Sequence, residues 1–266
     1  MSGEDELANL ASLKTDLTIA SIVGIAGLKS AFNSIGKTKI LALANKEAIV
    51  CSGNILMKKA KNYKTKILPL DSEHNALFQI IEKKNFDLIK NIVLTASGGP
   101  FWNKKINLNK VEVKQALKHP NWKMGKKISI DSATLMNKVL EKIEASILFN
   151  LPLSKVKILI HPKSIVHGIV NYKDGNSVML ASYPDMKIPI NYTLNWPIRT
   201  KTNFANICLE KVKELSFFNP NFKTFPSLKV FNYFNDNEPD YSKFISLNAS
   251  NEVAVNCFLR KKIKFL

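Results

Sequence analysis

The chain has 266 residues, of which 45% are hydrophobic, and a formal net charge of +18 at pH 7. This length suffices for one large domain or two smaller ones with a sizeable core. Apolar runs long enough to cross a membrane are missing, and the acidic N-terminal residues do not resemble an export signal. The cysteines, Cys51, Cys208 and Cys257, lie far apart in sequence, which favours a reduced, cytosol-like compartment.

The positive charge does not by itself indicate a nucleic-acid-binding protein. Only Arg199 and Arg260 are arginine, so 37 of the 39 basic residues are lysine. The lysines are scattered, aromatic residues do not interleave with them, and no nucleic-acid motif occurs. We therefore expect neither a nucleic acid nor a membrane as partner, although the positive field favours an anionic substrate.

The N-terminal part shows alternating strands and helices, which is typical of a parallel α/β layer. Residues 18–23 predict a strand followed by a glycine-containing turn and a helix, and residues 39–44 predict a second strand before a helix over 48–59. Asn45, Lys46 and Glu47 occupy the end of this second strand. Ligands gather at such strand ends beside helix N-termini. The alternative is a polar turn in which Glu47 favours the helix dipole.

Two further strand ends carry polar residues. Residues 67–70 lead into Asp71 and Glu73, and an extended backbone would point both carboxylates to one side, where Mg²⁺ or Mn²⁺ would stabilise them. Helix capping by Asp71 or Ser72 is the alternative. The next predicted strand, 91–95, ends in small residues that include Ser97, where backbone N–H groups could approach a phosphate or merely form a tight turn.

Residues 118–148 combine a loop with a long amphipathic pattern. The loop contains Trp122 and Met124, which suit a lid that excludes water, although a packed tryptophan in an ordinary loop is equally simple. We expect a short strand that ends at Asp131 and Ser132, followed by a helix with its apolar face in a core. On another face of that helix lie Asn137, Lys138 and Glu141. Their spacing suits phosphate and metal binding, or only a surface ion pair.

Residues 164–172 and 177–182 predict a hairpin around Asp174-Gly175, and residues 248–259 predict a final helix. Residues 200–243 permit no prediction. The expected fold class is α/β: a partial, Rossmann-like parallel sheet up to about Pro100, followed by an α+β catalytic domain with a hairpin-containing sheet. We place the domains at 1–100 and 101–266.

Together these stretches resemble the 1-deoxy-D-xylulose 5-phosphate reductoisomerase family, which acts in the non-mevalonate pathway of isoprenoid precursor biosynthesis. The segments that carry the resemblance occur in the family's order and cover nearly the whole chain. They are Leu43–Glu47, Asp71–Asn75, Thr95–Phe101, His119–Gly125, Lys127–Lys138 with Glu141, His161–Ser164, Pro184–Ile190 and Leu247–Glu252.

The resemblance implies an NADPH-dependent and metal-dependent enzyme that rearranges 1-deoxy-D-xylulose 5-phosphate and reduces it to 2-C-methyl-D-erythritol 4-phosphate. Asp71, Glu73 and Glu141 would bind Mg²⁺ or Mn²⁺, with Co²⁺ as a third candidate. Lys46 and Glu73 would be catalytic. The substrate would also contact the following residues: Ser72, Ser97, His119, Ser132, Asn137, Lys138 and Glu141.

The resemblance extends to the cofactor, the lid and the assembly. Asn45, Glu47 and Gly125 would contact NADPH, and Trp122 and Met124 would belong to a flap over the substrate. Residues 164–190 would form the sheet of a homodimer. The family's Gly-rich N-terminal turn and its C-terminal helical domain have no counterpart here. We expect a cytoplasmic protein, with a plastid-type organelle as alternative. The competing hypotheses are a chain that binds metal and sugar phosphate without NADPH, and an inactive basic binding protein.

Overall fold

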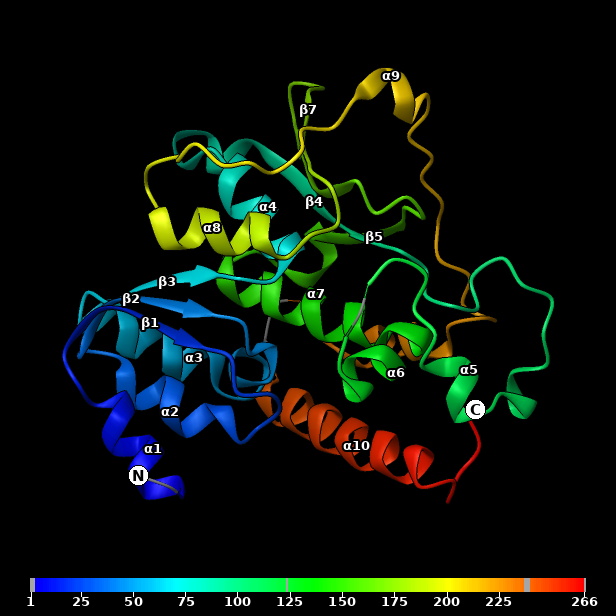
Figure 1. The fold of residues 1–266 in the computed structure, drawn as a ribbon, viewed down its shortest axis with the longest axis horizontal. Helices are drawn as coiled ribbons and strands as arrows, with labels where there is room; N and C mark the ends of the chain where they lie inside the picture. The colour runs from blue at the N-terminus through cyan, green and yellow to red at the C-terminus, as the bar shows by residue number, and fades with distance from the viewer. Residues whose placement is uncertain (1–2, 123, 237–239, 266) are drawn as a thin grey trace.

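The computed structural model describes residues 3–122, 124–236 and 240–265. Two sheets form its framework (Figure 1). The first is parallel with the order β1-β2-β3, and the second has the order β5-β4-β6-β7. The strands are β1 (Thr15–Ala20), β2 (Thr38–Leu43), β3 (Lys66–Pro69), β4 (Ile89–Ala96), β5 (Val156–Ile160), β6 (Val166–Tyr172) and β7 (Ser177–Ala181). This mixed α/β architecture confirms the predicted fold class.

Helices connect and cover the strands. The α-helices are α1 (Glu4–Ala11), α2 (Gly27–Ser34), α3 (Lys46–Asn62), α4 (Ser72–Ile80), α5 (Val113–Ala116), α6 (Lys126–Thr134), α7 (Met136–Leu148), α8 (Lys187–Asn195), α9 (Leu209–Val212) and α10 (Tyr241–Leu259). Short 3-10 helices lie at η1 (Lys83–Leu88), η2 (Leu108–Lys110), η3 (Leu153–Lys155) and η4 (Pro226–Tyr233). In the described part of the chain, no helix is long and apolar enough to cross a membrane.

The first sheet explains why the N-terminal polar residues meet. β2 pairs in parallel with β3, so that Leu43 lies beside Pro69 at the last residues of both strands. Residues that directly follow these strands therefore lie at one edge of the sheet. β1 begins earlier than predicted and is the edge strand, and its Ile19 is 46% exposed although the sequence suggested a buried strand.

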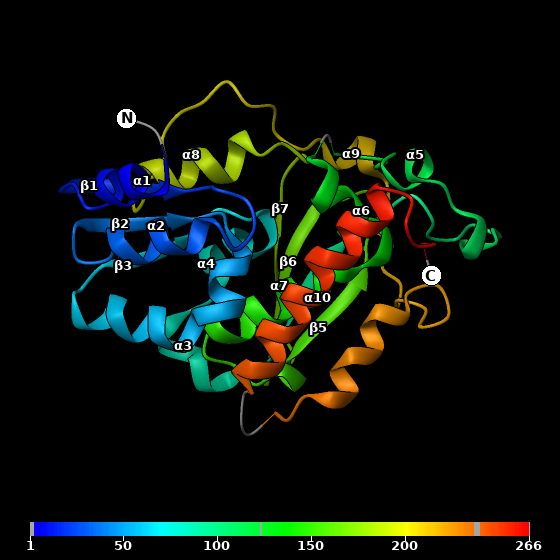
Figure 2. The same cartoon turned by 90° about the horizontal axis from the view of Figure 1, so that it is seen from below.

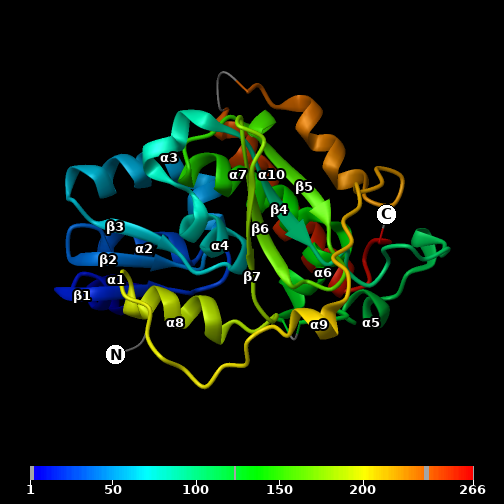
Figure 3. The same ribbon diagram turned by 90° about the horizontal axis from the view of Figure 1, so that it is seen from above.

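The second sheet contains β4, which the sequence placed in the parallel sheet. β4 pairs in parallel with β5 and antiparallel with β6 (Figure 3). Its continuous apolar pattern suits a strand buried on both faces, and such a pattern does not reveal which neighbours the strand will have. The predicted hairpin is confirmed as β6 and β7, with the backbone N–H of Asn176 donating to Asp174 Oδ1 in the turn.

The α7 helix packs centrally between the two sheets. Val139, Leu140 and Ile143 are fully buried in a core that also includes Val50 of α3. This confirms the predicted apolar face. α3 approaches α7 closely at Gly53, where an added Cβ would lie 2.7 Å from Ile147 Cγ2.

The region before α7 differs from the prediction. Residues 126–134 form the helix α6 rather than a short strand, and Asp131 and Ser132 lie inside it rather than at an N-cap. The chain turns at Leu135, whose φ of +59° separates α6 from α7. The strand prediction was wrong because alternating Ile and Ser residues over so short a run suit a half-buried helix equally well.

Candidate active site

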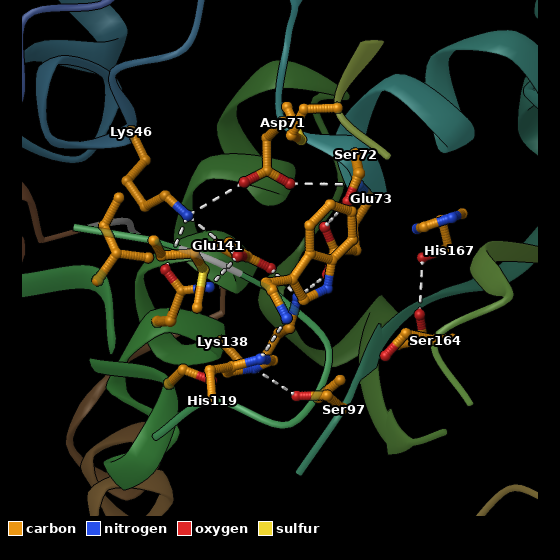
Figure 4. A pocket seen from close by; sticks show the side chains of 18 of the residues that line it. Lys46, Asp71, Ser72, Glu73, Ser97, His119, Lys138, Glu141, Ser164 and His167 are labelled. Carbon is orange, nitrogen blue, oxygen red and sulfur yellow. Dashed lines mark hydrogen bonds and ion pairs between the residues drawn. The ribbon is translucent and has the colours of Figure 1, made fainter. Parts of the chain in front are cut away.

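A cavity of about 300 Å³ lies beside the carboxyl ends of β2, β3 and β4 (Figure 4). The start of α3, the start of α4, the β4 end and the α6–α7 segment all contribute to its wall. Most of the residues singled out in the sequence line it. They are Lys46, Asp71, Ser72, Glu73, Ser97, His119, Trp122, Met124, Ser132, Asn137, Lys138 and Glu141. Asn45, Glu47 and Gly125 are not among its lining residues.

Three carboxylates meet in this cavity. Asp71, Glu73 and Glu141 each offer an oxygen atom, and these atoms all lie within 4.8 Å of one another. Asp71 is the N-cap of α4, where its Oδ1 accepts a hydrogen bond from the backbone N–H of Glu73 at 3.2 Å. The extended arrangement was therefore wrong and the capping alternative correct, yet the carboxylates still gather. Such a set of hard oxygen donors fits a divalent cation such as Mg²⁺ or Mn²⁺.

Two buried lysines neutralise much of this negative charge. Lys46 Nζ lies 3.1 Å from Asp71 Oδ2 and 3.0 Å from Glu141 Oε1, and donates to Asn137 Oδ1 at 2.8 Å. Lys138 Nζ pairs with Glu73 and with Glu141. Both lysine side chains are at most 10% exposed. Lys138 is thus a buried member of the cluster, not half of a solvent-exposed surface pair.

The pKa values follow from burial and from these charges. Burial is the largest influence on Glu73 and raises its pKa. Lys138 lowers this pKa, Glu141 and Asp71 raise it further, and the result is a pKa of about 7. Burial also raises the pKa of Asp71, but Lys46 and His74 outweigh it and hold that pKa well below its usual value. For Lys46, the carboxylates outweigh burial and raise the pKa well above the usual range. Lys46 is therefore a permanent ammonium in this arrangement.

The buried His74 ring lies within hydrogen-bonding distance of two residues of the carboxylate cluster. Its Nδ1 lies 3.2 Å from Asp71 Oδ1, and its Nε2 lies 2.9 Å from the backbone oxygen of Glu141. The carboxylate of Glu144 is 3.7 Å from Nε2. Burial lowers the pKa of His74, but Glu144 and Asp71 outweigh it and raise the pKa to about 9. The sequence reading of His74 as a helix residue rather than a ligand agrees with this geometry, whereas Glu144 was missed.

Ser97 and His119 form a second polar group in the cavity. Ser97 Oγ lies 2.9 Å from His119 Nε2. His119 Nδ1 accepts backbone N–H groups from Asn121 and Trp122 at 3.1 and 2.9 Å, so the ring proton belongs on Nε2, which donates to Ser97. Burial lowers the pKa of His119 to about 4, with a further contribution from Lys138, so the imidazole is neutral at pH 7.

Ser132 and the loop after β4 complete this group. Gly99 has a φ of +64°, and an added Cβ there would lie 2.8 Å from the backbone oxygen of Ser132. The glycine therefore lets the Ser97 loop approach α6 closely. Hydroxyls, a neutral imidazole N–H and a nearby ammonium are groups that bind a phosphate.

The loop between α5 and α6 lies over the cavity. The Trp122 ring meets the His167 ring edge-on at 6.4 Å, and Asn121 Nδ2 donates to Pro162 O and Ser164 Oγ, both at 2.8 Å. Residue 123 of the same loop lies outside the described residues. The roles of Asn121, Ser164 and His167 were missed, because these contacts join segments far apart in sequence.

The three residues assigned to the cofactor have other contacts. Asn45 caps α3 by accepting the Ala48 N–H at 2.7 Å, and its Nδ2 donates to Gly24 O at 2.8 Å. Glu47 Oε1 lies 2.6 Å from Lys127 Nζ. Gly125 is the exposed N-cap of α6, with open space where a Cβ would be.

Comparisons with known proteins show the family of the chain. Residues 1–53 match the family model for 1-deoxy-D-xylulose 5-phosphate reductoisomerase, residues 67–149 match the model for its C-terminal domain, and residues 181–266 match a DXP reductoisomerase C-terminal domain model. The enzyme of that name from Wolbachia pipientis is 49% identical over 99% of this chain and 68% of its own length. The chain belongs to the 1-deoxy-D-xylulose 5-phosphate reductoisomerase family.

Solved structures of the family have the same fold. The Zymomonas mobilis reductoisomerase in complex with NADPH superposes with a TM-score of 0.90 at 41% identity, over 99% of this chain and 68% of that one. A reductoisomerase in complex with NADPH, fosmidomycin and magnesium gives a TM-score of 0.91 at 40% identity, over 100% and 67%. The chain thus spans about two thirds of the length of these relatives. The resemblance inferred from the sequence motifs is confirmed.

Proposed function

We propose that this chain converts 1-deoxy-D-xylulose 5-phosphate to 2-C-methyl-D-erythritol 4-phosphate, using NADPH and a divalent metal. The observation that carries the proposal is the meeting of three carboxylates within 4.8 Å beside the Ser97–His119 pair in one cavity. A substrate with oxygen ligands at one end and a phosphate at the other fits these two groups. Family membership supports the same reaction.

The metal would be held by Asp71, Glu73 and Glu141. Mg²⁺ or Mn²⁺ bound there would supply Lewis-acid polarisation of the substrate's carbonyl and neighbouring hydroxyl oxygens. Lys46, a permanent ammonium 3.0 Å from Glu141, would stabilise negative charge that develops on those oxygens rather than act as a base. Ser72, whose Oγ donates to Glu73 Oε2 at 2.6 Å, lies where it would contact the sugar.

The phosphate would be held by Ser97, His119, Ser132, Asn137 and Lys138. His119 would donate from Nε2, because its Nδ1 already accepts two backbone N–H groups. Lys138 would supply the positive charge. Trp122 and Met124 line the same cavity and would exclude water once the loop closes over the substrate.

NADPH would supply the hydride for the reduction. Asn45 and Glu47 lie at the β2–α3 turn, at the edge of the parallel sheet where dinucleotides bind in such folds, and Gly125 offers open space at the start of α6. Because both side chains already have intramolecular partners, we propose that they shape this edge as much as they contact the cofactor.

The test is NADPH oxidation by the purified chain with 1-deoxy-D-xylulose 5-phosphate and Mg²⁺. We expect turnover that disappears when the metal or the phosphate group of the substrate is omitted. A folded chain that binds Mg²⁺ and the sugar phosphate but never oxidises NADPH would contradict the proposal and favour the binding-only alternative. The inactive basic protein is not favoured, because every predicted metal and phosphate residue is present in the cavity.

We further propose two domains, a homodimer and a cytoplasmic location; because β4 belongs to the second sheet, we move the proposed domain division from residue 100 to before β4. The dimer would use residues 164–190, where β7 is the edge strand of its sheet and Val178 and Met179 are 37% and 46% exposed. Unpaired apolar edges of this kind invite pairing with a second copy. Light scattering of the chain and of Met179→Lys checks the dimer, which the added charge should weaken.

A further inference from the structure

A second group of buried charges lies outside the cavity described above. Lys127 Nζ of α6 is 2.6 Å from Glu47 Oε1 of α3 and 2.9 Å from Asp131 Oδ2, one turn along α6. Asn251 Nδ2 of α10 donates to Asp131 Oδ1 at 2.9 Å. None of these four residues lines the main cavity. We call them the α3–α6–α10 cluster.

The cluster places one ammonium between two carboxylates. Glu47 and Asp131 are 4% and 1% exposed, so solvent does little to stabilise their charges. Among the described residues, Lys127 is the only cation that forms an ion pair with either carboxylate. Loss of Lys127 would leave two buried carboxylates without a cationic partner, which would favour displacement of their side chains and backbone.

The cluster residues are chain neighbours of two residues of the proposed site. Lys46, which pairs with Asp71 and Glu141, directly precedes Glu47. Ser132, which is one of the residues proposed to hold the substrate phosphate, directly follows Asp131. The cluster therefore fixes the separation between the start of α3 and the middle of α6. These two segments form different walls of the cavity.

The α10 helix extends this link to the loop after β1. Glu252 Oε1 accepts the backbone N–H of Ile25 at 3.3 Å and the side-chain N–H of Asn248 at 3.2 Å. Val23, in the same loop, lines the cavity. Figure 2 shows α10 running past α6 and α7, and α10 contacts α3, α6 and α7. The Leu247–Glu252 motif of the sequence thus has a structural role that the proposed reaction does not use directly.

We propose that Lys127 and Asn251 are positioning residues, which set Ser132 and Lys46 at the separation that the substrate requires. They act through Asp131 and Glu47 and touch no substrate themselves. This inference rests on the proposed function, because it concerns the distance between the phosphate end and the metal end of that substrate. A displacement of about 1 Å in such a site lowers the rate by about a hundredfold.

The first test is Lys127→Met, with Lys126→Met as the matched control. Lys126 is the neighbouring lysine on α6 and is exposed. We expect the KM for 1-deoxy-D-xylulose 5-phosphate to rise by about tenfold or more in Lys127→Met, while Mg²⁺ affinity changes less, because the three carboxylate ligands lie on other elements and only Lys46 links them to the cluster. An unchanged KM would overturn the proposal. So would a parallel loss of Mg²⁺ affinity, since this would indicate general disruption.

The second test keeps the proposal open to refutation if Lys127→Met fails to fold. Asn251→Asp places a second carboxylate against Asp131, and adding Asp131→Asn exchanges the two groups. We expect Asn251→Asp to raise the substrate KM and the double variant to restore it, whereas Asn256→Asp, at an exposed position on α10, has no effect. No rescue by the exchange would refute the pairing.

The failure of this inference is distinguishable from failure of the proposed function. Both sets of variants are also measured by calorimetry, with 1-deoxy-D-xylulose 5-phosphate titrated into the Mg²⁺-loaded chain. If the unmodified chain binds but does not turn over, the proposed function fails, and the binding constants still decide whether Lys127 and Asn251 position the site.

Discussion

Replacing Glu141 by Gln tests the proposed metal site most directly. Glu141 is 1% exposed, and its carboxylate is shared by Lys46, Lys138 and Asn137. Glutamine keeps the shape of the side chain and removes its negative charge. The change therefore separates the charge of this residue from its volume.

The expected magnitude follows from the charges in the cavity. With every group ionised, three carboxylates and two lysines sum to −1, and the substitution brings this sum to 0. Two unit charges 4 Å apart interact by about 4 kcal/mol at an effective dielectric constant of 20, and a divalent ion would double that figure before relaxation reduces it. We expect a net loss of about 3 kcal/mol, or a metal affinity more than about a hundredfold weaker.

The substitution should lower the free energy of unfolding by less than it weakens the free energy of metal binding. Breaking a single buried ion pair costs about 3–5 kcal/mol, but here Lys46 keeps Asp71 and Lys138 keeps Glu73 as partner. The substitution also removes a charge that repels Glu73, whose pKa is raised to about 7. We therefore expect the metal-free variant to remain folded.

The assay is calorimetric titration of Mg²⁺ and Mn²⁺ into the metal-free chain at pH 8, where Glu73 is mostly ionised. Urea unfolding of the same samples reports stability, and Glu210→Gln, on an exposed residue, is the control. Metal affinity equal to that of the unmodified chain would show that Glu141 is not a ligand, and the proposed metal site would be wrong.

Three further predictions concern other parts of the site. Lys138→Met should lower kcat/KM for the phosphorylated substrate, measured as NADPH oxidation, by about 10–100-fold, since a charge-assisted hydrogen bond is lost. Gly99→Ala should lower the free energy of unfolding by about 1–3 kcal/mol, because its Cβ would meet the Ser132 backbone oxygen at 2.8 Å; Gly175→Ala, at φ +94° in open space, should cost less in the same urea titration. Burial lowers the pKa of His167 to about 4, although its hydrogen bond to Ser182 opposes this. The unfolded chain therefore takes up the proton first, so His167 contributes a loss of about 2 kcal/mol of stability between pH 7 and pH 5. The difference between the unfolding free energies at pH 7 and pH 5, measured by urea titration, should shift by this amount in His167→Leu, and an unchanged difference would refute the prediction.

The first half of the site was predictable because parallel strands align their carboxyl ends. Lys46 follows β2 and Asp71 follows β3, and these neighbouring strands end side by side. This geometry brings the two side chains to 3.1 Å whatever the detailed backbone at Asp71. The two side chains therefore meet although Asp71 caps a helix instead of lying on an extended segment.

The part of the site on α7 depends on contacts between segments far apart in sequence, which a local sequence pattern does not encode. Glu141 joins the cluster because α7 crosses the molecule close to α3, an approach that Gly53 permits. The break at Leu135, with φ of +59°, is made by a residue that rarely adopts this conformation, so no sequence signal marks it. Only the resemblance to the family linked Glu141 to Asp71 and Glu73 in advance.

Stability and function are coupled in this cavity. Three carboxylates in one cluster, each at most 17% exposed, would not remain ionised alone, and Lys46 and Lys138 stabilise the ionised carboxylates. The same lysines are the groups proposed to stabilise the reacting oxygens and the phosphate. Because each lysine pairs with two carboxylates, single substitutions must be non-additive, and no residue of the cluster has a separable contribution. The charges that allow the cluster to fold are therefore the charges proposed to do its chemistry.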